Sequence, residues 1–86
     1  MAAIDLLYYG RLRDEIGRDR EPVDVPSHVL TVDDLLVWLR SQSEAHASAL
    51  GSEAGIGAAV AGEWAAPTDS VFGAAEVVLF PPRGVL

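Results

Sequence analysis

Segment 30–43, LTVDDLLVWLRSQS, gives the strongest secondary-structure signal in the chain. Thr31 suits a helix N-cap, and the two aspartates that follow fall in the first turn, where the helix dipole favours negative charge. Apolar residues then recur at helical spacing and form one stripe: Val32, Leu35, Leu36 and Leu39. The pattern predicts an amphipathic helix over about 31–43 whose apolar stripe is buried.

Strand signals precede this helix. Segment 4–10 is short, apolar and closed by glycine, which is typical of a buried strand. Segment 11–17 predicts a helical turn that ends at Gly17. Two prolines bracket the alternating residues of 20–28, and they favour a short edge strand because proline cannot donate to a sheet ladder.

Further strand signals follow the helix. Segment 44–50 predicts a second short helix, and 55–64, built of Gly, Ala and Val, indicates a central strand. Segment 76–80 is expected to be the last buried strand, which Pro81 stops. Two strands, one main helix and two further strands predict an α+β fold with a mixed sheet of four to five strands packed on that helix.

Length and composition restrict the function. Eighty-six residues predict a single domain over 1–80 with an extended tail over 81–86. The net charge of −7 disfavours nucleic acid and favours partners with a basic docking face. No apolar run reaches the ~20 residues of a membrane span. The first apolar stretch is not preceded by basic residues, so a signal peptide is not expected. Together with the absence of cysteine, these features favour a cytoplasmic protein without a membrane partner.

No group of side chains forms a catalytic or metal-binding motif. His28 and His46 are isolated, so we expect both at the surface or boundary, without metal. Asp33 and Asp34 are explained by the start of the helix, and the serines lack a nucleophile motif. We therefore expect no catalytic residue and no bound cofactor.

The C-terminal segment is the candidate functional element. Two prolines fix an extended course and follow the last strand directly, so the tail is expected to project and to enter a partner. The candidate tail residues are Pro81, Pro82, Arg83, Gly84, Val85 and Leu86.

Three aromatic residues are candidates for a partner interface beside the tail: Trp64, Phe72 and Phe80. The strand of small residues at 56–61 cannot fill a core, so Phe72 and Phe80 are also expected to supply its bulk. Trp64 follows a turn signal, and exposed and core positions are both open for it.

Four segments in order resemble a known family. YYGRLRDEIG, LTVDDLLVWL, GAAVAGEWA with TDSVFGAAEVVLF, and FPP resemble the small, sulfur-carrying subunit of molybdopterin synthase, a ubiquitin-like β-grasp protein. The resemblance implies a non-catalytic carrier subunit of a sulfurtransferase complex in molybdenum cofactor biosynthesis. It implies two kinds of partner: an ATP-dependent activating enzyme, which adenylates the C-terminal carboxylate before it becomes a thiocarboxylate, and the large synthase subunit, which receives the tail in a heterotetramer.

The tail departs from the family pattern. Aligned on the prolines, Val85 and Leu86 stand where the family has Gly-Gly. Three explanations remain open: a divergent member that no longer carries sulfur on this terminus, a precursor trimmed after Gly84, or a terminus that is altered or that fits a variant partner site. Two other functions also remain open, namely a ubiquitin-like binding module without carrier chemistry and a sulfur carrier of another pathway such as thiamine synthesis.

Overall fold

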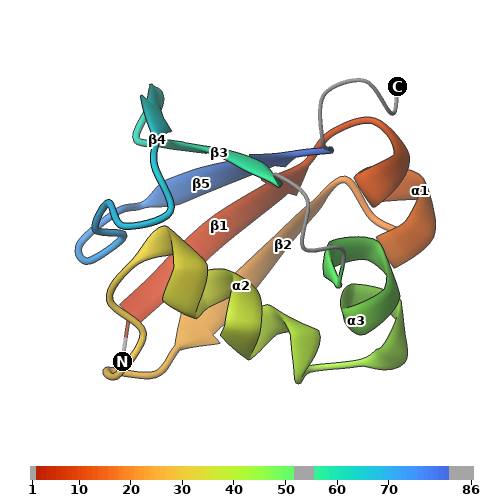
Figure 1. Ribbon diagram of the computed structural model, residues 1–86, viewed down its shortest axis with the longest axis horizontal. Helices are drawn as coiled ribbons and strands as arrows, with labels where there is room; N and C mark the ends of the chain where they lie inside the picture. The colour runs from red at the N-terminus through yellow and green to blue at the C-terminus, as the bar shows by residue number, and fades with distance from the viewer. Residues whose placement is uncertain (1, 52–55, 82–86) are drawn as a thin grey trace.

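The computed structural model describes residues 2–51 and 56–81, which form a mixed five-stranded sheet with helices packed on it (Figure 1). The candidate tail residues Pro82, Arg83, Gly84, Val85 and Leu86 lie outside the described residues. In chain order the elements are β1 (Ala2–Tyr8), α1 (Arg11–Ile16), β2 (Arg20–Val25), α2 (Val32–Arg40), α3 (Glu44–Leu50), β3 (Gly57–Val60), β4 (Glu63–Ala65) and β5 (Glu76–Phe80). The α+β fold expected from the sequence is confirmed.

The strand order in the sheet is β2-β1-β5-β3-β4. β1 and β5 pair in parallel, with Leu6 opposite Val77, whereas the other neighbours are antiparallel. β2 is an edge strand, as its prolines predicted. The sheet therefore joins the beginning and the end of the described chain at its middle, and β1 and β5 both end at the same side of the fold.

The expectation of one central strand over 55–64 was wrong. The chain reverses at Ala61 and Gly62, whose φ angles are 53° and 86°, and β3 and β4 form a hairpin around them. Positive φ at both central residues is the geometry of the type I′ turn, which is common in two-residue hairpins. The middle strand is β5, and β3 lies between β5 and β4.

The main helix begins as predicted and is shorter at its end. Thr31 accepts a hydrogen bond from the backbone N–H of Asp34, and the Asp34 carboxylate accepts one from the backbone N–H of Thr31, which closes a capping box. α2 ends at Arg40. Its predicted stripe is buried against the sheet, and burial of each leucine contributes roughly 1.5–3 kcal/mol.

The core consists of aliphatic residues, and the expectation that Phe72 and Phe80 fill it was wrong. Phe72 is 77% exposed, and Phe80 is half-buried on the other face of β5 from Val77 and Leu79. Leucines from α1, α2 and α3 supply the missing bulk, together with Tyr8 from β1. The small residues of β3 therefore face helices that carry large side chains.

Candidate functional site

The described chain ends at the root of the tail, where Pro81 is buried beside Gly10. Gly10 has φ 57° and ψ −135°, a conformation that residues with a side chain rarely adopt. A Cβ atom at Gly10 would stand 3.2 Å from Cγ of Pro81. Glycine here both permits the turn out of β1 and leaves room for the proline that begins the tail.

Three aromatic rings adjoin this root, and we call them the aromatic platform: Tyr9, Trp64 and Phe80. The ring centroids of Tyr9 and Phe80 are 4.9 Å apart, as are those of Trp64 and Phe80. Alternation along the strands puts the platform on the face of the sheet opposite the core. Tyr9 is 55% exposed and Trp64 75% exposed, so the platform presents apolar surface directly beside Pro81.

The structure brings together two of the three aromatic residues that the sequence singled out. Trp64 and Phe80 are in contact through their rings, whereas Phe72 lies in the turn before β5, at the opposite end of that strand. Tyr9 was missed because YYG was read as part of a buried strand. Strand alternation was the available signal, since Tyr8 and Tyr9 must point to opposite faces.

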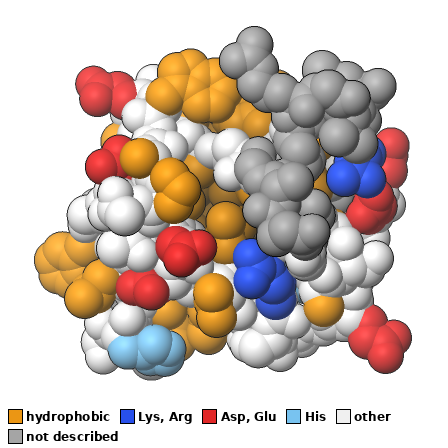
Figure 2. All heavy atoms as spheres, in the orientation of Figure 1, with side chains coloured by type: hydrophobic (Ala, Val, Ile, Leu, Met, Phe, Trp, Pro, Cys, Tyr) orange, Lys and Arg blue, Asp and Glu red, His pale blue; other side chains and the backbone are white. Residues whose placement is uncertain are grey.

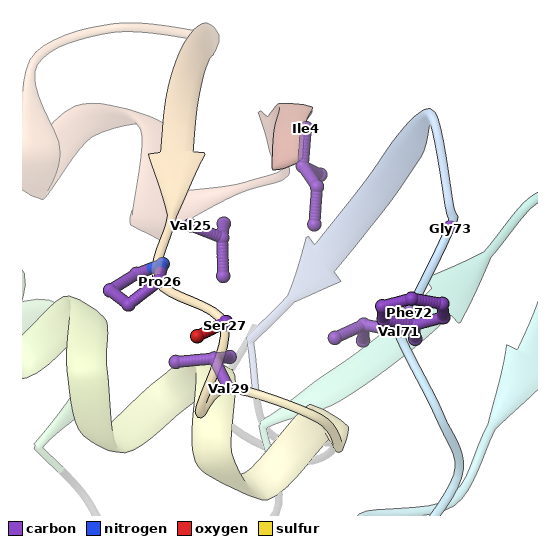
Figure 3. Close-up of a pocket in the computed structure, with 8 residues that line it drawn as sticks. All are labelled: Ile4, Val25, Pro26, Ser27, Val29, Val71, Phe72 and Gly73. Carbon is purple, nitrogen blue, oxygen red and sulfur yellow. The ribbon is translucent and has the colours of Figure 1, made fainter. Parts of the chain in front are cut away.

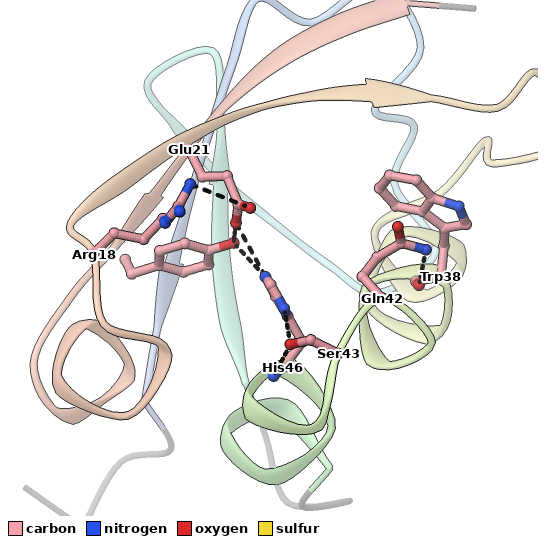
Figure 4. Close-up of polar contacts among 7 residues, drawn as sticks. Arg18, Glu21, Trp38, Gln42, Ser43 and His46 are labelled. Atoms are coloured by element: carbon pink, nitrogen blue, oxygen red, sulfur yellow. Dashed lines mark hydrogen bonds and ion pairs between the residues drawn. The ribbon is translucent and has the colours of Figure 1, made fainter.

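A polar cluster on the core side of the sheet was also missed, and it shows that His46 is buried and not at the surface or boundary as expected. His46 is 8% exposed, and its Nε2 donates to Oε1 of Glu21 at 3.0 Å. The Tyr8 hydroxyl donates to the same oxygen at 2.8 Å, and Arg18 approaches the other carboxylate oxygen at 3.6 Å. Figure 4 shows Glu21 and His46 directed toward each other from β2 and α3.

Hydrogen bonds favour the ionised form of Glu21 in this cluster. Burial opposes ionisation of Glu21, but hydrogen bonds from His46 and Tyr8 outweigh it and lower the pKa of the carboxyl. Burial and the same carboxylate raise the pKa of the Tyr8 phenol. Glu21 is therefore an anion that fastens α3 to β1 and β2.

The Ser43–His46–Glu21 chain resembles a catalytic triad, but its hydrogen bonds serve a helix cap. Oγ of Ser43 accepts the backbone N–H of His46 at 3.1 Å and lies 2.7 Å from Nδ1 of its ring. Nε2 donates to Glu21, so Nδ1 and Oγ of Ser43 share the second hydrogen bond of the ring. Ser43 is thus the N-cap of α3, and the cluster serves to hold that helix in place.

Among residues 2–51 and 56–81, no three His, Cys, Asp or Glu side chains gather as metal ligands would. His28 is exposed in the turn after β2. None of the helices in this part of the chain combines the length and apolar character needed to cross a membrane.

Comparison with known proteins gives matches among solved structures. No protein-family model and no curated protein sequence matches the chain. The putative molybdopterin converting factor subunit 1 from Pyrococcus furiosus superposes with a TM-score of 0.75 and 21% identity, over 95% of this chain and 99% of that one.

The small archaeal modifier protein 1 from Haloferax volcanii also matches. One structure gives a TM-score of 0.71 with 28% identity, over 96% of this chain and 98% of that one. Another gives a TM-score of 0.63 with 25% identity, over 95% and 99% of the two chains.

These matches show that the fold is ubiquitin-like β-grasp. Within that class the chain is similar to a molybdopterin converting factor subunit and to an archaeal modifier, which confirms the resemblance that the sequence suggested. Both similarities extend over nearly the whole length of the compared chains.

Proposed function

We propose that the chain is a sulfur-carrier subunit, of the kind that serves molybdopterin synthase. It would present its C-terminal segment first to an ATP-dependent activating enzyme and then to a large catalytic subunit. The observation that carries the proposal is the junction at the end of β5, where a buried Pro81 anchors the root of the tail beside an exposed aromatic platform. Whole-chain likeness to a molybdopterin converting factor subunit supports it.

The carrier chemistry needs no catalytic side chain from this protein. The terminal carboxylate attacks the α-phosphate of ATP, and pyrophosphate leaves as an acyl adenylate forms. A sulfide-level donor on the partner then attacks the acyl carbon, and AMP leaves as the thiocarboxylate forms. In the proposed scheme, the described residues supply the fixed root from which the carboxylate reaches these partners.

The platform is the proposed docking surface for the large subunit. Aromatic residues are strong anchors in protein interfaces because they bury large area at little cost in side-chain entropy. Trp64 also lies next to the tail root, so a partner that covers it would receive the tail at the same time. The net charge of −7 favours a basic rim on that partner.

The first experiment follows the mass of the intact chain after incubation with ATP, a sulfur donor and the activating enzyme from the same source. A gain of about 16 mass units, one sulfur in place of one oxygen, would support the carrier function. An unchanged mass with an activating enzyme that is active on its own substrate would favour a ubiquitin-like binding module. A product that ends at Gly84 and then gains sulfur would identify a trimmed precursor.

The second experiment tests the platform through binding to the large subunit. Trp64→Ala should weaken binding by roughly 30-fold or more, which is the cost of a typical aromatic anchor. Phe72→Ala is the matched control, because Phe72 is as exposed as Trp64 and lies at the far end of β5. Equal losses for both variants, or none for Trp64→Ala, would remove the platform from the proposal.

A second candidate is a protein-modifier role, which the likeness to the archaeal modifier at 28% identity favours. The same activated carboxylate would then form an amide with an amine of another protein. Incubation with an extract from the source organism would separate the two roles. A modifier would give a ladder of larger species that resists thiol reagents, whereas a carrier would give none.

A further inference from the structure

An apolar hollow lies at the end of the sheet opposite the tail root. It has a volume of about 300 Å³ and is bounded by β1, β2, the turn after β2 and the turn before β5 (Figure 3). The lining residues are Ile4, Val25, Pro26, Ser27, Val29, Val71, Phe72 and Gly73. Ser27 alone among them has a polar side chain, so the hollow suits an apolar group.

Phe72 stands at this hollow as an exposed aromatic side chain, 77% accessible, while Val29 and Val71 are almost fully buried behind it. A volume near 300 Å³ is at the low end of small-molecule sites. It therefore has room for one or two large apolar side chains of a partner and not for a nucleotide-sized cofactor.

The surroundings of the hollow are acidic. The residues that line the hollow are uncharged, but the chain directly beside them, at 30–34, 66–70 and 74–76, contains Asp33, Asp34, Asp69 and Glu76 and neither Arg nor Lys. In Figure 2 acidic side chains lie on both the left and the right of the molecule, whereas the basic ones lie only toward the centre and right. The charge near the hollow is thus negative, and it would attract a basic peptide.

Backbone hydrogen bonds hold this acidic border in place. The turn before β5 is tied to the start of α2, because the N–H groups of Val32 and Asp33 donate to the carbonyls of Asp69 and Pro67 at 3.0 and 2.9 Å. The N–H of Val71 donates to the carbonyl of Leu30 at 2.9 Å. Backbone donors from Leu30 and Thr31 lower the pKa of Asp34, so this carboxylate is ionised near neutral pH. The negative charges are therefore fixed beside an apolar site.

We propose that the hollow binds a basic peptide segment of a partner protein, with one large apolar side chain in the hollow and flanking Lys or Arg on the acidic border. An apolar anchor explains the lining, and basic flanks match the charges on 25–34 and 66–76. A second copy of this chain fits less well, because it would bring an equally acidic surface against this one.

The site is separate from the proposed docking platform. The hollow lies where β1 begins and before β5 starts, whereas the platform and Pro81 lie where both strands end. A partner other than the large subunit could therefore bind the protein at the hollow while the tail is inserted elsewhere. The proposal does not depend on the carrier function, and its test uses no activating enzyme.

The test is a titration of the ¹⁵N-labelled protein with the peptide acetyl-Lys-Arg-Phe-Leu-Arg-Lys-amide, followed by the backbone amide signals. Residues 27–30 and 70–74 should shift, and those at Tyr9, Trp64 and Phe80 should not. A peptide with two serines in place of Phe-Leu should bind at least about tenfold more weakly, and raising the salt to ~0.5 M should weaken the original peptide because charges are screened.

Two variants separate the apolar from the charged contribution. Phe72→Ala should weaken the peptide roughly tenfold, which corresponds to loss of a single aromatic contact. Asp33→Asn should weaken it about two- to threefold and reduce the salt dependence. Trp64→Ala is the matched control and should leave peptide affinity unchanged, the reverse of its expected effect on the large subunit.

Several outcomes would overturn the proposal. Shifts confined to the platform would place the peptide on the other surface, and equal binding of the serine peptide would leave only non-specific charge attraction. Sedimentation that reveals a dimer lost on Phe72→Ala would assign the hollow to a second copy of the chain. Absence of shifts at millimolar peptide in a protein whose amide spectrum is well dispersed would show that the hollow has no affinity for such segments.

Discussion

The two ends of the sheet are held together by different kinds of contact. At the end where β5 stops, an ionised carboxylate joins three elements, and aromatic rings cover the sheet surface beside the tail root. At the end where β5 starts, backbone hydrogen bonds hold two turns around an apolar hollow. The first end depends on side chains for its cohesion and the second on main chain. Single substitutions should therefore affect stability more at the tail end than at the hollow.

The largest expected effect tests the carboxylate. Glu21→Ala removes the acceptor of both Tyr8 and His46 and leaves buried polar groups unpaired, so the free energy of unfolding should fall by about 2–3 kcal/mol. Asp24→Ala, an exposed acid on the same strand, should change it by less than ~0.5 kcal/mol. Urea denaturation would measure both. Equal effects of the two substitutions would mean that the hydrogen bonds of Glu21 do not contribute to the free energy of unfolding.

The next comparison uses one glycine from each end. Gly10→Ala forces a side chain into a positive-φ position against Pro81, so we expect a loss of about 2 kcal/mol. Gly73→Ala also meets positive φ, but nothing lies within 4 Å of its Cβ position, and a loss of about 1 kcal/mol should follow. The difference, read from thermal or urea unfolding, combines the packing of the tail root with the strain of the backbone conformation at Gly10. Equal losses for the two variants would contradict this role of Gly10.

Acid provides a second test of the Glu21 carboxylate, because low pH protonates it. The pKa of Glu21 is lowered from its ordinary value of 4.5, so the folded state binds this proton less readily than the unfolded state. Its contribution to stability is therefore present above pH 4.5 and is lost as the pH falls through the folded-state pKa. Stability of the native chain should decline more steeply below that pH than stability of Glu21→Gln. Parallel curves would contradict the assigned role.

The smallest expected effect concerns the hairpin that presents Trp64. Ala61 adopts φ 53° in the turn between β3 and β4, which costs a residue with a side chain roughly 1 kcal/mol. Ala61→Gly should therefore stabilise the fold by about 0.5 kcal/mol after the added chain entropy is subtracted. A slightly higher midpoint in thermal unfolding would support this, and a lower one would show that the turn is not strained.

The fold could be anticipated where short-range chemistry decides structure. The N-cap at Thr31, the end of α1 at Gly17 and the prolines that bracket the edge strand each act on their immediate neighbours. Each of these signals was interpreted correctly. The small residues of 57–65 carry no such signal. Ala-Gly is a weaker hairpin-turn signal than Asn-Gly, and apolar–polar alternation cannot be recognised where the residues on both faces of a strand are small. The hairpin was missed for this reason.

The candidate site was less predictable because its residues meet across the sheet. Trp64 and Phe80 were singled out from their type, but only the pairing of β3 with β4 and β5 puts their rings in contact. The contact of His46 with Glu21 spans two elements far apart in sequence, and an isolated histidine gives no hint of its partner. Phe72 is exposed because of the path of the turn before β5, and the sequence pattern did not predict that path.

The parallel pairing of β1 with β5 has a consequence for synthesis of the protein. The strand at the middle of the sheet is the last of the described strands to be synthesised, so a nascent chain that stops before Glu76 has two separate edges where the finished molecule has a continuous sheet. Completion of the sheet therefore waits for β5. A nascent chain without that strand has no closed interior for its helices to cover.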